Sequence, residues 1–281
     1  LTWAGWERTL DIRVLNVRAL GEGDALIASV PEISLSLSAK ALLKGMIAPK
    51  SIEMFRPSLK LVRHRDGTFE VGFNTEASDS EQFMHQMFSL MLDKPNPSHP
   101  MSFLSRVNIF DADLTVIDQS LQTAWSAPSA QVQFWRDSNG LRGDLTMDLL
   151  VGETKANVSV LGSYLEKEGR FDLGVDFNDV TPAAFANLSP KFSALAGLEV
   201  PFQGTLTYSI LVDGTVESIG FDVAGSKGAV SLPVKTAQKL GLLSLAQRVE
   251  VERVDFRGRY EGISDKFEIN SLTFEFGDKG R

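Results

Sequence analysis

The chain has 281 residues, of which 43% are apolar and 23% charged, a balance that fits a folded protein and excludes intrinsic disorder. Its 28 basic and 36 acidic residues give a net charge of −8, which argues against nucleic-acid binding because a phosphate backbone requires a cationic surface. A chain of 281 residues can form one large all-β unit or two smaller ones, each with a core.

The absence of cysteine and the hydropathy of the chain exclude further classes of protein and site. The chain contains no cysteine, which removes disulfides, thiol nucleophiles and cysteine-based zinc sites. This composition is compatible with the cytosol and also suits an oxidising periplasm. No run reaches the roughly 18 apolar residues of a membrane-spanning helix, and no signal peptide is recognisable. From the start at Leu1 and the charged segment 277–281, we expect a piece of a longer protein.

Residues 1–93 are predicted to form a first β unit. Alternation of apolar and polar side chains is the pattern of strands with one dry and one solvated face. It predicts strands at 9–18, 28–37, 51–63 and 68–73.

One part of this unit is locally basic. The charges are spaced along the chain and do not form one block, so a solvated strand face explains them better than a polybasic lipid anchor does. The basic residues are Lys40, Lys44, Lys50, Arg56, Lys60, Arg63 and Arg65, and the one acidic residue between them is Glu53.

A helix is predicted over residues 80–92, because Ser78 and Glu81 fit a capping box and apolar side chains follow at helical spacing. Its Met-rich face suits a core helix that closes the first unit or an adaptable lid. The possible lid residues are Phe83, Met84, Met87, Phe88 and Met91. The three prolines in residues 94–100 oppose a helix, so this segment is predicted to be an extended linker.

Residues 101–281 are predicted to form a long antiparallel meander. Asn139-Gly140, Glu168-Gly169 and Asp213-Gly214 are tight-turn signals at hairpin spacing, and no βαβ rhythm occurs. Helical interruptions are expected at 181–195, which Pro190 breaks, and at 233–247.

The last hairpin contains a change of register. Phe267 and Ile269 share a face, but Leu272, Phe274 and Phe276 continue that row only after a one-residue shift, which predicts a β-bulge. The expected fold class is therefore mainly β: an antiparallel meander that forms a curled, groove-like sheet with one or two short helices.

The sequence contains no recognisable catalytic signature, and we expect neither an enzyme nor a cofactor. The three histidines lack metal-ligand spacing, and nucleophile elbows and phosphate-binding loops are missing. Acidic residues such as Asp144 and Asp172 fall on the polar side of predicted strands, where solvated charge explains them better than a glycosidase pair does. Trp125 and Trp135 could stack a sugar ring, although packing explains them better.

Three passages resemble the AsmA-like bacterial envelope proteins, in particular the YhdP/TamB branch. In the first, alternating strands at 10–17 and 33–37 precede Ala41-Leu42-Leu43-Lys44-Gly45 and a strand, 52–61, that is interrupted by Pro57. The second runs from Thr181-Pro182 through Pro201-Phe202-Gln203-Gly204 to Asp213-Gly214, and the third pairs 249–260 with 267–276. The resemblance covers nearly the whole chain and consists of patterns, not of catalytic motifs.

This resemblance implies a periplasmic segment whose parent is held in the inner membrane by an anchor helix that this chain lacks. The family's rolled β-sheets form a trough that conducts phospholipids toward the outer membrane, so the expected partner is phospholipid. In a dry-walled groove, acyl chains avoid water while head groups stay hydrated. The expected groove-lining residues are Leu114, Val116, Leu145, Met147, Leu149, Val158, Val160, Phe171, Leu173, Val175, Phe177, Leu206, Tyr208, Ile210, Ile219, Phe221 and Val223.

Two other interpretations remain open from the sequence. The same alternating strands fit a closed β-sandwich that serves as a passive envelope scaffold, with a filled interior and no bound lipid. A glycan-binding β domain would instead expose Trp125 or Trp135 beside a carboxylate pair in a cleft.

Overall fold

The computed structural model describes residues 10–20, 24, 26–66, 68–75, 96, 98–136, 139–151, 154–186, 188–231, 233–239, 241 and 248–277. The strands are β1 (Asp11–Leu20), β2 (Leu26–Leu37), β3 (Pro49–Phe55), β4 (Ser58–Arg63), β5 (Phe69–Phe73), β6 (Arg106–Asp118), β7 (Thr123–Arg136), β8 (Gly140–Val151), β9 (Thr154–Leu165), β10 (Arg170–Val180), β11 (Leu198–Glu199), β12 (Phe202–Leu211), β13 (Val216–Gly225), β14 (Gly228–Val230), β15 (Val249–Glu261) and β16 (Lys266–Phe276). The helices are α1 (Ala39–Leu42), α3 (Pro182–Phe185), α4 (Val234–Lys239) and the 3₁₀ segments η2 (Pro100–Phe103) and η3 (Pro190–Gly197).

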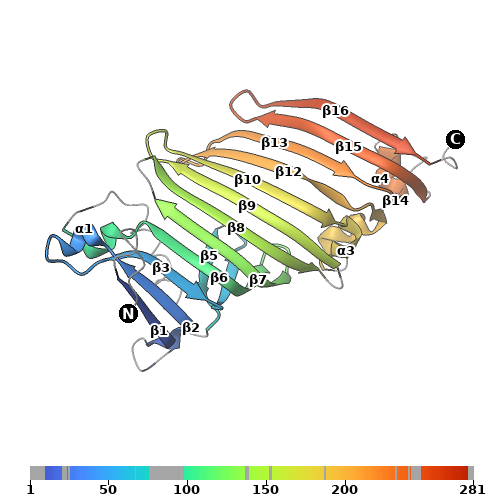
Figure 1. Ribbon diagram of the computed structural model, residues 1–281. Coiled ribbons are helices and arrows are strands. Elements are labelled where there is room, and N and C mark those ends of the chain that lie inside the picture. Colours follow the sequence, from blue (N-terminus) through green and yellow to red (C-terminus); the bar gives the residue numbers. More distant parts are fainter. Residues whose placement is uncertain are drawn as a thin grey trace. The chain divides into compact units, whose positions relative to one another are not determined.

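The predicted mainly β fold class is confirmed (Figure 1). The strands form one sheet in the order β1-β2-β3-β6-β7-β8-β9-β10-β12-β13-β15-β14-β11, with β16 on β15 and the β4–β5 pair on β6. Most pairings are antiparallel, as hairpins require, but β6 pairs in parallel with β3 and with β4.

The expected strand 51–63 is two strands, β3 and β4, because the chain kinks at Arg56 and Pro57. Arg56 has a φ of 53°, and Asp111, opposite it on β6, has a φ of 52°. Few non-glycine residues adopt this left-handed conformation, so the matched pair marks a shared irregularity in both strands. The Arg56 N–H donates to the Phe110 carbonyl at 2.8 Å, and the Asp113 N–H donates to the Pro57 carbonyl at 3.0 Å. The kink lets β2 pair with β3 while β5 pairs with β4.

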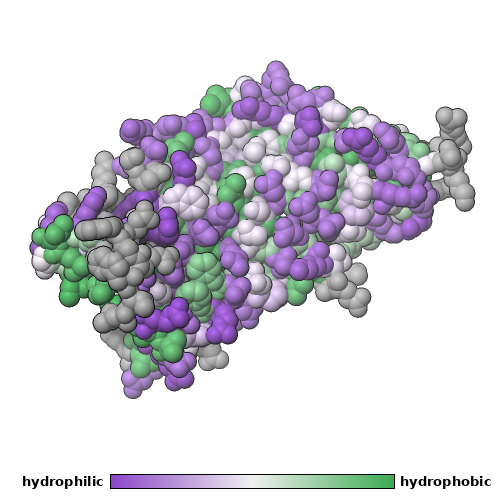
Figure 2. Space-filling model, viewed as in Figure 1, coloured by the Kyte–Doolittle hydropathy of each residue, from purple (hydrophilic) through white to green (hydrophobic). Residues whose placement is uncertain are grey.

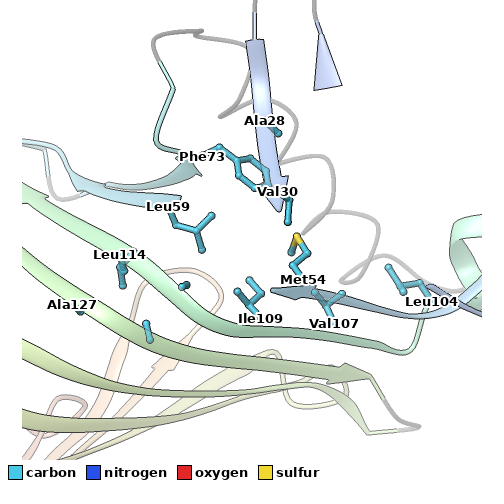
Figure 3. Packing of buried hydrophobic residues seen from close by; sticks show 12 residues of the cluster. Ala28, Val30, Met54, Leu59, Phe73, Leu104, Val107, Ile109, Leu114 and Ala127 are labelled. Atoms are coloured by element: carbon cyan, nitrogen blue, oxygen red, sulfur yellow. The ribbon is translucent and has the colours of Figure 1, made fainter. Parts of the chain in front are cut away.

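The strands around this kink enclose a packed core (Figure 3). Leu59 and Phe73 come from the β4–β5 hairpin, Val30 from β2, and Ile109 from β6, and all four are buried. Because these side chains approach from several strands, they cover one another. The complete buried cluster is Ala28, Val30, Met54, Leu59, Phe73, Leu104, Val107, Ile109, Ala112, Leu114, Ala127 and Ala130.

The structure divides into two compact units, and their limits differ from the predicted ones. Hydrogen bonds of β6 with β3 and β4 join residues on both sides of 94–100, so this segment does not separate the two units. The first unit comprises Leu1–Ser120, Ala124–Met147 and Gly162–Glu168, and the second comprises Leu121–Thr123, Asp148–Leu161 and Gly169–Arg281.

The helical predictions fall into three groups. The interruption expected at 181–195 is present as α3 and η3, and Pro190 begins η3, as a residue without an N–H can. Part of the segment 233–247 forms α4. The Met-rich segment 80–92, with the possible lid residues Phe83, Met84, Met87, Phe88 and Met91, lies outside the described residues. Within the described ranges, no helix has the length and hydrophobicity needed to cross a membrane.

Candidate functional site

The second unit contains a ladder of five strands whose apolar side chains align across the sheet. The register places Val175 on β10 opposite Leu206 on β12, and Leu206 opposite Phe221 on β13. Because side chains alternate between faces, every residue in such a row points to the same side of the sheet. Three rows run Phe177–Gly204–Val223–Phe256–Leu272, Val175–Leu206–Phe221–Gly258–Ile269 and Leu173–Tyr208–Ile219–Tyr260–Phe267.

We call the apolar residues of these three rows, with Phe171, Ile210, Phe274 and Phe276, the apolar face. Much of it is exposed: Phe171 is 38%, Leu173 42% and Leu206 40% accessible. On β16, the apolar side chains are between 44% and 54% accessible. The apolar residues of this face on β13 and β15, such as Phe221 and Phe256, are half-buried. Large exposed apolar patches are uncommon on folded proteins and make this face a candidate binding surface.

The opposite face of the same strands is polar. Arg257 on β15 forms an ion pair with Asp222 on β13 at 2.8 Å, and the Ser209 hydroxyl donates to Asp172 at 2.6 Å. Thr205 likewise donates to Asp176. Over these C-terminal strands, the side seen in Figure 2 carries mainly hydrophilic residues. The sheet is therefore amphipathic, with one solvated face and one dry face.

The buried cluster of the second unit lies at one end of the ladder. It consists of Val200, Val230, Val251 and Val254, with Leu198 and Phe202 packed against them. Leu198 and Val230 come from the short strands β11 and β14. Val200 lies just before β12, Phe202 begins β12, and Val251 and Val254 lie at the start of β15. Packing at this end leaves the middle of the apolar face, around Leu206, exposed.

An aromatic cluster forms part of the apolar face. The Phe221 ring stacks on Phe256 with centroids 4.5 Å apart and on Phe267 with centroids 5.6 Å apart. Gly258 lies opposite Phe221 in the register of β13 and β15. It makes room for the Phe221 ring, because a Cβ on Gly258 would lie 2.5 Å from Phe221 Cζ. The same Cβ would lie 2.5 Å from the Glu268 carbonyl oxygen of β16.

We therefore expect Gly258→Ala to weaken the attachment of β16 to β15. Both the backbone and the Phe221 ring must shift, and such overpacking costs about 1–3 kcal/mol of unfolding free energy. Hydrogen-exchange mass spectrometry should show faster exchange in β16, with a lower Tm. The matched control is Gly174→Ala on β10, where a Cβ meets nothing within 4 Å. Equal effects of the two substitutions would contradict this explanation of Gly258.

The predicted groove-lining residues fall into three groups. Leu114 is buried in the core of the first unit, and Val116, Leu145 and Met147 pack against that core. Leu114 is thus covered by the protein's own side chains, and the other three are half-buried against them. In the second unit, Leu149, Val158 and Val160 are half-buried. The other ten predicted residues lie on the apolar face: Phe171, Leu173, Val175, Phe177, Leu206, Tyr208, Ile210, Ile219, Phe221 and Val223.

The structure adds residues of β15 and β16 to this surface. Phe256, Tyr260 and Leu272 were not among the predicted lining residues, although both strands were expected. The alternation of Val254, Phe256 and Tyr260 was available as a signal, but Gly258 interrupts it. The predicted bulge is confirmed, because the register shifts between Arg257 and Gly258.

The described residues give little support for other chemistry. His64 lies 2.9 Å from Glu70, and this hydrogen bond raises the pKa of the imidazole, while His99 is exposed and His85 lies outside the described residues. Trp125 and Trp135 are both half-buried on β7. No cluster of three or more potential metal ligands occurs in the ranges that the structure covers.

A hollow of about 400 Å³ lies near the end of β13 and the start of β15. Its wall carries the ion pairs Lys227–Glu252 at 3.0 Å and Arg253–Asp255 at 2.5 Å, so these charges neutralise each other. The apolar face is therefore the stronger candidate site. No family model, curated protein or solved structure matches the chain, so the candidate site stands on its geometry alone.

Proposed function

We propose that this chain shelters the acyl chains of phospholipids on the apolar face of the second unit. The observation that carries the proposal is the alignment of apolar rows across five antiparallel strands, with exposed apolar side chains on β10, β12 and β16. Head groups would remain in water at the rim, so a specific head-group pocket is not required. In this proposal the chain is neither an enzyme nor a cofactor-binding protein.

The dimensions of the apolar face suit hydrocarbon. Five strands spaced about 4.8 Å apart span about 19 Å, and the rows along a strand repeat about every 6.7 Å. One leaflet of a bilayer's hydrocarbon core is about 15 Å thick, so a tail of that length fits across the ladder. Each methylene removed from water contributes about 0.8 kcal/mol, which makes even a shallow apolar surface an effective shelter.

The setting that best suits this activity is the periplasm, between the inner and outer membranes. The resemblance to AsmA-like proteins motivates this part of the proposal, as it does an inner-membrane anchor in the parent. The packed core of the first unit refines the idea, because Leu114 is buried in it and Val116, Leu145 and Met147 pack against it. The first unit then acts as a scaffold, and lipid contacts are confined to the second unit.

Mass spectrometry of organic extracts from gently purified protein tests the proposal. We expect co-purified phospholipid and, after delipidation, renewed uptake from vesicles. Photo-crosslinkers at Leu173 should label lipid, whereas the same group at Asp172, the next residue on the opposite face, should not. Absence of bound lipid together with failure of uptake would support a passive scaffold instead.

A further inference from the structure

The first unit also carries an exposed apolar surface that is far smaller than a sheet face. We call residues 39–48, which form α1 and the turn after it, the α1 tip. Leu43 is 90% and Ile47 75% accessible, and Leu42 is exposed beside them. Figure 2 shows a hydrophobic patch at the left, where Figure 1 places α1.

The α1 tip is held by a fixed backbone. Ala41 and Ala48 at its base are fully buried, and the Ser38 N–H donates to the Ala48 carbonyl at 2.9 Å. The Ser38 hydroxyl caps the helix by accepting from the Ala41 N–H. The apolar side chains are thus presented to the outside by a firm base.

The helix ends in a Schellman motif. The Met46 N–H donates to the Ala41 carbonyl and the Gly45 N–H donates to the Leu42 carbonyl, while Gly45 has a φ of 72°. The N–H groups of Leu42, Leu43 and Lys44 donate to the carbonyls of Ser38, Ala39 and Ala41. A segment whose N–H donors are satisfied internally can approach hydrocarbon at a low desolvation cost.

The charges of the α1 tip oppose those of the whole chain. Lys40 and Lys44 are exposed beside the apolar side chains, and no acidic residue occurs between Glu32 and Glu53, although the chain has a net charge of −8. Lys44 also lies over the Phe103 ring, 5.8 Å from its centroid. Protruding Leu and Ile next to lysines are the pattern of an interfacial membrane contact.

We infer that the α1 tip docks the first unit onto an anionic lipid surface, with Leu43 and Ile47 inserted and Lys40 and Lys44 among the head groups. A membrane fits this site better than a protein partner does. Stable protein interfaces bury about 800 Å² on each side through about 20–30 residues, and the tip offers ten. This docking is separate from acyl-chain binding on the apolar face.

Flotation with phospholipid vesicles tests the inference on the whole chain. Wild-type protein should float with vesicles of phosphatidylcholine and phosphatidylglycerol, and less with phosphatidylcholine alone. Leu43→Glu combined with Ile47→Glu should lower binding at least about tenfold, since carboxylates are costly at the interface. Lys40→Glu combined with Lys44→Glu should remove the preference for the anionic vesicles. Circular dichroism should show unchanged folding, because these side chains are exposed.

Two controls separate the α1 tip from other apolar surfaces. Ile263 is 78% accessible in the β15–β16 turn but lies between Glu261 and Asp265, so Ile263→Glu should float like wild type. Leu206→Glu alters the apolar face and should also leave flotation unchanged. The inference is overturned if wild-type protein does not bind anionic vesicles. It is equally overturned if Ile263→Glu or Leu206→Glu abolishes flotation while the Leu43/Ile47 double variant retains it.

Discussion

Leu206→Glu should reduce the phospholipid retained by the purified protein at least about tenfold while leaving the protein folded. Leu206 lies on β12, the second of the five strands of the proposed contact region, with Val175 and Phe221 as its neighbours across the sheet. With no lipid bound, its 40% accessible side chain allows a carboxylate to reach water. With lipid bound, the carboxylate would be buried against hydrocarbon, and a penalty of only about 1.4 kcal/mol already lowers affinity tenfold.

Thr207→Glu is the matched control, because Thr207 is the next residue on the same strand and points to the polar face, opposite Gly174 and Gly220. Lipid per protein, measured by mass spectrometry of organic extracts, should fall for Leu206→Glu and stay at the wild-type level for Thr207→Glu. Loss of folding in Leu206→Glu alone would show that Leu206 is a core residue. Unchanged lipid in a folded Leu206→Glu protein would exclude this face as the binding surface.

Period-two alternation predicted the strands well, because it follows directly from backbone geometry. The dry faces of the strands that carry Leu173, Val175 and Phe221, and the bulge in the last hairpin, could be inferred from side-chain spacing alone, whereas the alignment of these residues across strands could not. Alternation identifies the dry face of a strand. It does not reveal what covers that face, because coverage depends on contacts between residues far apart in the sequence.

Leu114 and Leu173 illustrate this difference. Both occupy apolar positions of alternating strands, yet Leu114 is 7% and Leu173 42% accessible. Leu114 is covered because β4 pairs in parallel with β6 and because the kink at Arg56 and Asp111 lets strands diverge around it. Parallel pairing across more than forty residues leaves no local sequence signal, so the packed core of the first unit was not predictable in this way.

Removing a leucine side chain from the packed core should destabilise the protein far more than removing one from the apolar face. Leu104 is 1% accessible in the core of the first unit, and we expect Leu104→Ala to lower the unfolding free energy by about 2–5 kcal/mol through lost transfer energy and a residual cavity. Trp125 and Trp135 lie on β7 in the first unit, and the second unit's ranges contain no tryptophan. Urea unfolding followed by tryptophan fluorescence therefore reports this loss directly.

Leu206→Ala removes the same atoms from the open face, where water already reaches the side chain. Its cost should stay below about 1 kcal/mol, because burial is incomplete and no enclosed cavity forms. Hydrogen exchange in β12 measures it, since the second unit lacks a tryptophan probe. A cost equal to that of Leu104→Ala would mean that native side chains already fill the apolar face, and hydrocarbon would then have no surface to occupy. A small loss of unfolding free energy in Leu206→Ala, with lipid still bound, would show that the apolar face contributes more to ligand binding than to the stability of the fold.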